Sequence, residues 1–210
     1  MTTLDHALND LRSFFDEKAK THGAVFQSVD WNSPERQKTV FHQLIKIWIN
    51  PQDSASILDF GCGYGALLDF LQAENYSLTK YIGYDFSSSM IENALQTHPR
   101  QEGVVFTNEV AQLPQADFVI AGGILGMKKN ATEDEWTNHC FETLDQLWGF
   151  SRKGMAFNSL TSYSDADKMR PDLYYADPCR FFDYCKTKFS RNVALLHDYG
   201  LYEFTILVQR

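Results

Sequence analysis

The chain has few of the features that mark nucleic-acid-binding, membrane-bound or secreted proteins. Its 19 Lys and Arg are outnumbered by 27 Asp and Glu, and no basic run interrupts the sequence. Nucleic acid and anionic membranes bind clustered cations, so neither is an expected partner. No apolar stretch reaches the ~20 residues that cross a bilayer, and the N-terminal pattern is acidic and amphipathic, without a signal-peptide core. We therefore expect a cytoplasmic protein.

Cysteine is also sparse, and its spacing excludes the common metal sites. The four cysteines, at positions 62, 140, 179 and 185, form no CxxC pair and no Cys/His array with zinc-site spacing. A CxxxCxxC triplet for an iron–sulfur cluster is missing as well. We predict reduced thiols and no metal site. With 210 residues, the chain is expected to fold as one domain.

Hydrophobic periodicity along the chain predicts an α/β fold. Two helical patterns come first, and the second follows a Ser33-Pro34 helix start. From residue 55 onwards, short apolar runs alternate with helical segments, as in βαβ units with a parallel sheet. Strands are expected at 104–107, 116–123 and 154–160, and a long polar stretch covers 161–175. The chain closes with two β-rich runs, 192–199 and 202–210, which predict a hairpin and an antiparallel last strand.

The most informative segment is a glycine-rich turn between a strand and a helix. An apolar strand ends in Asp59 and is followed by Gly61, Gly63 and Gly65. Glycine there permits a tight turn and brings the backbone close to a ligand, while the next helix points its N-terminal amides at the same place. A second acid, Asp85, ends the following strand 20 residues beyond Gly65, where it can accept both hydroxyls of a ribose. Together these features predict a nucleoside-binding site.

These segments resemble the signatures of class I S-adenosylmethionine-dependent methyltransferases. The resemblance rests on Asp59-x-Gly61-x-Gly63-x-Gly65, Tyr84-Asp85-Phe86-Ser87 and Ala116-Asp117-Phe118-Val119. It implies a three-layer α/β sandwich with a seven-stranded sheet in the order 3-2-1-4-5-7-6, the last strand antiparallel, and N-terminal helices. It also implies a single domain with residues 1–50 as a helical lid, 51–160 as the cofactor-binding core, and 161–210 as the acceptor-side loop, helix and hairpin.

The same resemblance assigns cofactor-binding roles to particular residues. The glycine turn would hold the methionine end of the cofactor, the acid after the second strand would hold its ribose, and the tripeptide after the third strand would face the adenine. Here Glu109 stands where the family more often has Asp. A tryptophan before the second helix would close over the cofactor. The predicted cofactor-binding residues are Trp31, Asp59, Gly61, Cys62, Gly63, Gly65, Asp85, Phe86, Ser87, Asn108, Glu109, Val110 and Gly122.

The acceptor side is less defined by the sequence. Open α/β sheets bind ligands beyond the carboxyl ends of their strands, which favours Gly122, Gly123 and Ile124 after the fourth strand and Asn158, Tyr163 and Asp165 after the fifth. His197 and Tyr163 are the candidate catalytic residues, with His197 as a base near neutral pH. The motif of nucleic-acid amino-methyltransferases is missing after strand four. We expect transfer to an N or O atom of a small molecule, with release of S-adenosylhomocysteine; a homodimer stays open.

Two other functions remain open at this point. Gly61-x-Gly63-x-x-Ala66 also satisfies the dinucleotide fingerprint of NAD-dependent oxidoreductases. Against that function, Asp59 would repel a pyrophosphate, and a terminal hairpin is not expected in the second half of a dehydrogenase. The other alternative is a non-catalytic cofactor-binding protein, because methyl transfer requires no particular catalytic side chain.

Overall fold

One mixed β-sheet organises the protein, with strand order β3-β2-β1-β4-β5-β7-β6. The computed structural model describes residues 2–210. Neighbouring strands are parallel from β3 through to β5, and β7 runs antiparallel to both β5 and β6. The predicted fold class, strand order and antiparallel last strand are confirmed. The strands are β1 (Ala55–Phe60), β2 (Leu78–Tyr84), β3 (Val104–Thr107), β4 (Ala116–Ala121), β5 (Ser151–Leu160), β6 (Asn192–Leu196) and β7 (Glu203–Gln209).

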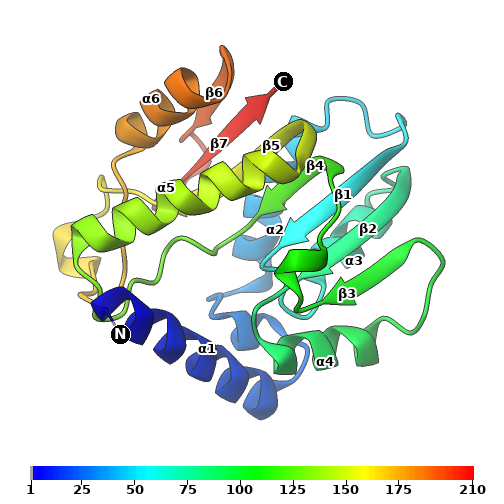
Figure 1. Cartoon of the computed structure of the whole chain (residues 1–210), viewed down its shortest axis with the longest axis horizontal. Coiled ribbons are helices and arrows are strands. Elements are labelled where there is room, and N and C mark those ends of the chain that lie inside the picture. The colour runs from blue at the N-terminus through cyan, green and yellow to red at the C-terminus, as the bar shows by residue number, and fades with distance from the viewer. Residues whose placement is uncertain (1) are drawn as a thin grey trace.

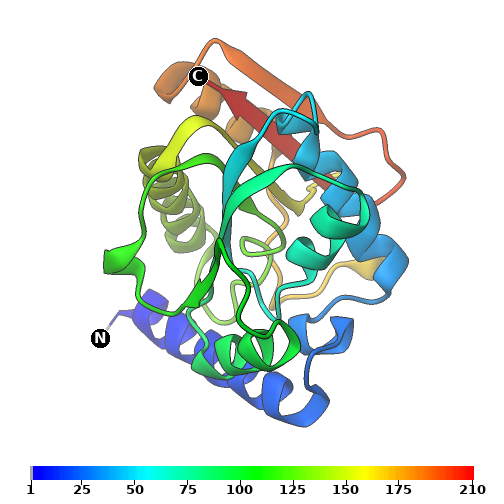
Figure 2. The same ribbon diagram turned by 90° about the vertical axis from the view of Figure 1, so that its right-hand side faces the viewer.

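Helices cover both faces of the sheet and the edge where its parallel strands end. Helices α5 and α6 lie on one face and α2 and α3 on the other, while α1 runs beside α4 below the carboxyl ends of the strands (Figures 1 and 2). The helices are α1 (Thr3–His22), α2 (Pro34–Leu44), α3 (Ala66–Ala73), α4 (Ser88–Thr97), α5 (Glu133–Phe150) and α6 (Pro178–Lys188), with short 3-10 turns at η1 (Phe26–Val29), η2 (Ile45–Ile47), η3 (Val110–Gln112) and η4 (Ala166–Lys168).

Two hydrophobic layers hold this arrangement together, because alternate residues of each buried strand face opposite sides. Leu58 and Phe157 belong to the layer under α5 and α6, whereas their neighbours Ile57 and Ala156 belong to the layer under α2 and α3. Helix starts are set by local chemistry: the Ser33 hydroxyl accepts a hydrogen bond from the Arg36 amide at 3.2 Å at the start of α2. The glycine turn is therefore carried on a strand that is packed on both faces.

The observed ends of β4, β5 and β6 differ from those predicted from the sequence. β4 stops at Ala121, before Gly123, which has a φ of 76° and so leaves the extended conformation. β5 begins at Ser151, which pairs with Ala116 of β4. β6 ends at Leu196, so His197 lies just past the strand and does not end it.

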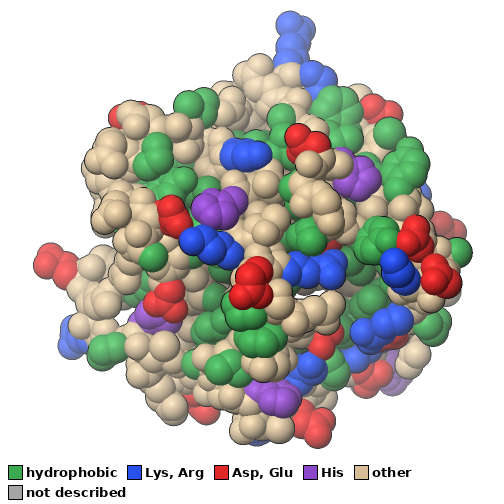
Figure 3. All heavy atoms as spheres, turned by 180° about the vertical axis from the view of Figure 1, so that it is seen from behind, with side chains coloured by type: hydrophobic (Ala, Val, Ile, Leu, Met, Phe, Trp, Pro, Cys, Tyr) green, Lys and Arg blue, Asp and Glu red, His purple; other side chains and the backbone are tan. Residues whose placement is uncertain are grey.

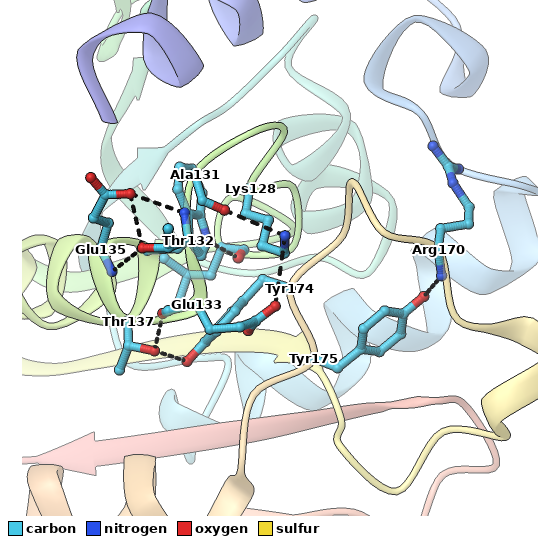
Figure 4. A network of polar contacts seen from close by, with 11 residues as sticks. Lys128, Ala131, Thr132, Glu133, Glu135, Thr137, Arg170, Tyr174 and Tyr175 are labelled. Atoms are coloured by element: carbon cyan, nitrogen blue, oxygen red, sulfur yellow. Dashed lines mark hydrogen bonds and ion pairs between the residues drawn. The ribbon is translucent and has the colours of Figure 1, made fainter. Parts of the chain in front are cut away.

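The long polar stretch is tied to the rest of the fold. Leu173 forms a bridge with Met127, and the amides of Lys128 and Lys129 both donate to the Asp172 carbonyl. The Tyr174 hydroxyl lies 2.7 Å from the Thr137 hydroxyl near the start of α5 (Figure 4). Residues 172–174 are thus tied to residues 127–129 and to α5, and Tyr174, which is 4% exposed, is a packing residue.

None of the helices within residues 2–210 combines the length and the apolar character that crossing a membrane demands. On the face shown in Figure 3, acidic and basic side chains are intermingled.

Candidate functional site

The turn between β1 and α3 is built from glycines in the left-handed region. Gly61, Gly63 and Gly65 have φ values of 84°, 54° and 92°. A Cβ on Gly61 would lie 2.2 Å from Cγ2 of Ile124, and one on Gly63 would lie 2.5 Å from Cγ1 of Val29. Glycine is therefore required twice, by the backbone conformation and by the side chains that face the turn.

Asp85 lies at the end of β2 and closes onto this turn. Its carboxylate accepts hydrogen bonds from the amides of Gly63 and Ser87, both at 2.9 Å, and it is 7% exposed. Burial raises the pKa of Asp85 to about 6, against the lowering effect of those two amide hydrogen bonds. The Ser87 hydroxyl in turn donates to Asp16 of α1 at 2.5 Å, which ties the N-terminal helix to this acid.

Asp59 supplies a second buried carboxyl group beside the first. The Tyr81 hydroxyl donates to it at 2.5 Å. Burial raises the pKa of Asp59 to about 7; the Tyr81 hydrogen bond lowers that pKa, and the nearby charge of Asp85 raises it. Two acids with raised pKa values thus face the same space, which favours a ligand that brings a positive charge or several hydroxyl donors.

A cavity of about 330 Å³ opens above these acids. Leu8, Leu11, Arg12 and Phe15 of α1 form one wall, and Phe60, Tyr84 and Phe86 form an aromatic wall. Of the residues predicted to bind a cofactor, those that line the cavity are Trp31, Asp59, Gly61, Cys62, Asp85, Phe86 and Gly122.

The other predicted cofactor residues are not part of this lining. Gly63, Gly65 and Ser87 lie behind the surface, where they shape the turn and hold Asp85. The tripeptide after β3, residues 108–110, does not line the cavity either, and the Glu109 amide is bound to the Thr107 hydroxyl at 3.1 Å. The structure therefore separates the residues that face the space from those that support them.

The two candidate catalytic residues lie together but away from this space. The rings of Tyr163 and His197 are 5.9 Å apart, and Tyr163 is 70% exposed. Neither residue lines either of the two cavities described here. Their catalytic role stays a prediction.

A second cavity of about 190 Å³ adjoins the first. The two share Phe15, Val29, Trp31, Gly123 and Met127 as lining residues. Its other walls include Arg36, Asn158, Ser159, Arg170 and Glu203, of which only Asn158 was expected from the sequence.

A buried polar chain links the walls of this second cavity. Arg36 donates to Glu203 through Nε at 3.1 Å and Nη2 at 2.9 Å, and the Asn158 amide nitrogen donates to the other carboxylate oxygen at 2.6 Å. The Asn158 oxygen accepts from the Gly123 amide at 2.7 Å. The signal that could have found Glu203 is an acid at the start of a mainly apolar strand, since a charge that becomes buried there needs a partner.

Comparison with known proteins gives the family. Residues 58–146 match a family model described as a methyltransferase domain. The Mycobacterium tuberculosis (strain ATCC 25618 / H37Rv) protein Rv1506c, provisionally named a methyltransferase, is 49% identical over 162 residues, which are 77% of this chain and 97% of the relative. The chain belongs to the class I S-adenosylmethionine-dependent methyltransferases.

Solved structures share the fold of this methyltransferase. Magnesium protoporphyrin IX methyltransferase from Synechocystis PCC 6803, with bound S-adenosylhomocysteine, has a TM-score of 0.66 at 17% identity, covering 96% of this chain and 99% of that chain. The N-methyltransferase NodS from Bradyrhizobium japonicum WM9, also with S-adenosylhomocysteine, has a TM-score of 0.63 at 12% identity, covering 94% and 98%. The oxidoreductase and non-catalytic alternatives give way to an enzyme of this family.

Proposed function

We propose that this methyltransferase binds S-adenosylmethionine in the larger cavity and methylates an N or O atom of a small molecule held in the smaller one, releasing S-adenosylhomocysteine. The neighbouring cavities support this division, because a methyl donor and its acceptor must meet at one point. Trp31 and Gly123 line both cavities and mark that meeting point.

The observation that carries the proposal is the setting of Asp85. Its two oxygens are each aligned by one backbone amide, from Gly63 and from Ser87, and the group lines the cavity. A carboxylate oxygen can accept more than one hydrogen bond, so both oxygens keep capacity for the adjacent hydroxyls of a ribose. The residues present therefore fit the sugar of the cofactor.

The remaining parts of the cofactor also find suitable neighbours. Asp59 faces the cavity with a pKa of about 7, so a ligand ammonium group beside it would favour its charged form. Ala66 and Leu67 line the cavity at the start of α3, where first-turn amides lack helical partners and attract a carboxylate. The purine fits the aromatic wall of Phe60, Tyr84 and Phe86.

When bound in this cavity, S-adenosylmethionine would supply an activated methyl group on its sulfonium sulfur. The protein has to hold the methyl group and the acceptor in line and keep water out. Leu8, Leu11 and Phe15 of α1 give the cavity an apolar wall that serves this exclusion.

Asp85→Asn tests the proposal directly. The amide cannot accept from both the Gly63 and the Ser87 amide as the carboxylate does, and it loses the charge that would bind ribose hydroxyls. We expect titration calorimetry to show at least about tenfold weaker binding of S-adenosylmethionine and S-adenosylhomocysteine, with wild-type protein binding neither NAD nor NADH.

The matched control is Asp183→Asn on α6, an exposed acid that lines neither cavity. It should bind both nucleosides as the wild type does. Unchanged affinity in Asp85→Asn, or no heat of binding with the wild type, would contradict the proposed site.

A further inference from the structure

Ser159 has an unusual position in the smaller cavity. It is 2% exposed, and among the buried side-chain N and O atoms of residues 2–210 its hydroxyl is the one without a hydrogen-bond partner. A buried hydroxyl without a partner destabilises the folded state, so native structures rarely leave one without a reason. Ser159 is among the residues that line the cavity, and because its hydroxyl oxygen is itself buried, a rotation of the side chain is needed to bring it to a ligand atom there.

Two arginines on the cavity wall keep donors in reserve. Arg36 uses Nε and Nη2 on Glu203. Arg170 uses Nε at 3.0 Å and Nη2 at 2.5 Å on Asp172. A guanidinium group has more N–H donors than these bonds use, and its planar geometry suits a carboxylate.

The acids on the same wall are already engaged. The Glu203 side chain is 6% exposed, and its two oxygens accept from Arg36 and Asn158. Asp30 accepts from the Lys18 ammonium group at 2.5 Å. Each of these acids thus has a cationic partner within the protein. The donors that remain for a ligand are those of the two guanidinium groups and the Ser159 hydroxyl.

We propose that the acceptor carries a carboxylate, which Arg170, Arg36 and Ser159 bind in the smaller cavity. This inference rests on the proposed function and names the acceptor class. The methylated N or O atom lies at the other end of the molecule, where the cavities meet at Trp31 and Gly123. There the lone pair forms the new bond to carbon, the sulfur keeps the electron pair of the broken bond, and the acceptor proton passes to solvent.

The chain itself offers variants that change the ligand contact and leave the fold in place. In Figure 4 the Arg170 side chain extends away from Tyr175, whose hydroxyl accepts from the Arg170 backbone amide, so Arg170→Gln keeps that bond. Ser159→Ala removes a hydroxyl that has no partner within the protein. Arg152→Gln is the matched control, because Arg152 is exposed on β5 and lines neither cavity.

The probes are matched pairs of small aromatic acids and their amides: 3-aminobenzoate with 3-aminobenzamide, and 4-hydroxybenzoate with 4-hydroxybenzamide. Each is titrated by calorimetry into protein saturated with S-adenosylhomocysteine. We expect each acid to bind at least about tenfold more tightly than its amide. Arg170→Gln should remove this preference, and Arg152→Gln should keep it. Ser159→Ala should weaken acid binding by a few fold without lowering the melting temperature.

The same samples distinguish a failure of the proposed cofactor site from a failure of the carboxylate inference. Absence of S-adenosylhomocysteine binding would overturn the proposed function itself. If that nucleoside binds but the amides bind as well as the acids, or neither acid binds, the carboxylate inference is wrong.

Discussion

The two cavities share a wall but differ in how the chain builds them. One side of the larger cavity comes from two short segments, residues 59–62, 64 and 66–67 and residues 84–86, which begin at the ends of the neighbouring strands β1 and β2. The polar wall of the smaller one joins residues 36, 123, 158–159, 170 and 203. The proposed nucleoside site can thus be carried by a local pattern, whereas the proposed acceptor site depends on the whole fold.

The two cavities also differ in their ionisable groups. The larger cavity holds Asp59 and Asp85, whose pKa values are raised to about 7 and about 6 by burial. In the smaller cavity, burial also raises the pKa of Glu203, but Arg36 and its hydrogen bonds act against that rise. The larger cavity therefore gains from a ligand that brings donors, whereas the buried acid of the smaller cavity, Glu203, is already paired within the protein.

Arg36→Ala should have the largest effect on stability. It leaves the Glu203 carboxylate buried without its cationic partner, which costs about 2–4 kcal/mol of unfolding free energy. The pKa of Glu203 then rises further, so the folded state binds more protons than the unfolded state, and stability falls as pH increases above about 4, the ordinary pKa of a glutamate. Urea denaturation at several pH values measures this.

Lys38→Ala on the same helix is the control, because its pair with Glu74 at 3.0 Å is exposed. It should cost less than about 1 kcal/mol. An equal loss of unfolding free energy in the two variants would show that the buried Arg36–Glu203 pair contributes no more than the exposed Lys38–Glu74 pair.

Gly61→Ala should have the next largest effect, centred on the larger cavity. Alanine at this position would have to adopt a left-handed backbone conformation, which side chains disfavour. Its Cβ would also lie 2.2 Å from Cγ2 of Ile124. We expect a loss of about 1–3 kcal/mol in stability and weaker binding of S-adenosylhomocysteine by calorimetry.

Gly149→Ala offers the opposite case, since it lies in α5 with no atom within 4 Å of a new Cβ. It should be neutral or should stabilise by about 0.5–1 kcal/mol. Similar behaviour of the two glycine variants would show that the turn is not specially constrained.

Tyr81→Phe should have the smallest effect, a change of pH dependence. The Tyr81 hydroxyl favours the charged form of Asp59, so its loss raises the pKa of Asp59 further. In the wild type, binding of the cofactor ammonium group should strengthen as pH rises through about 7, while the stability of the ligand-free protein falls over the same range. In the variant, the binding midpoint should move up by about one pH unit.

Calorimetry across pH, with Tyr76→Phe as the control, measures this shift. Tyr76 packs on Trp48 and lines neither cavity. Identical binding profiles for wild type and Tyr81→Phe would mean that Asp59 does not face the ligand charge.

Much of the fold was predictable because its signals are local. The strand alternation around residues 57–60 and 116–121, the Ser33 cap and the terminal hairpin each specify structure through neighbours in sequence. The strand order itself came from the family resemblance. The strand end at Leu196 was not predictable, because pairing with Thr205 ends there only once β7 is in place.

Several predictions stay untested. The cofactor roles of residues 108–110, the catalytic roles of His197 and Tyr163, the division at residues 50 and 160, the cytoplasmic location and the open question of a homodimer are among them. Sequence alone does not orient the residues assigned to the adenine and to catalysis, because short loops after strands can point in many directions and only packing selects one.

The glycine turn and its paired acid follow directly from the order of the residues, because φ angles, short turns and strand ends are set over a few neighbouring positions. The partnership of Arg36 with Glu203, separated by 167 positions, and the isolated hydroxyl of Ser159 exist only once distant segments are packed together. Burial and pairing are properties of that packing, and no local pattern encodes them.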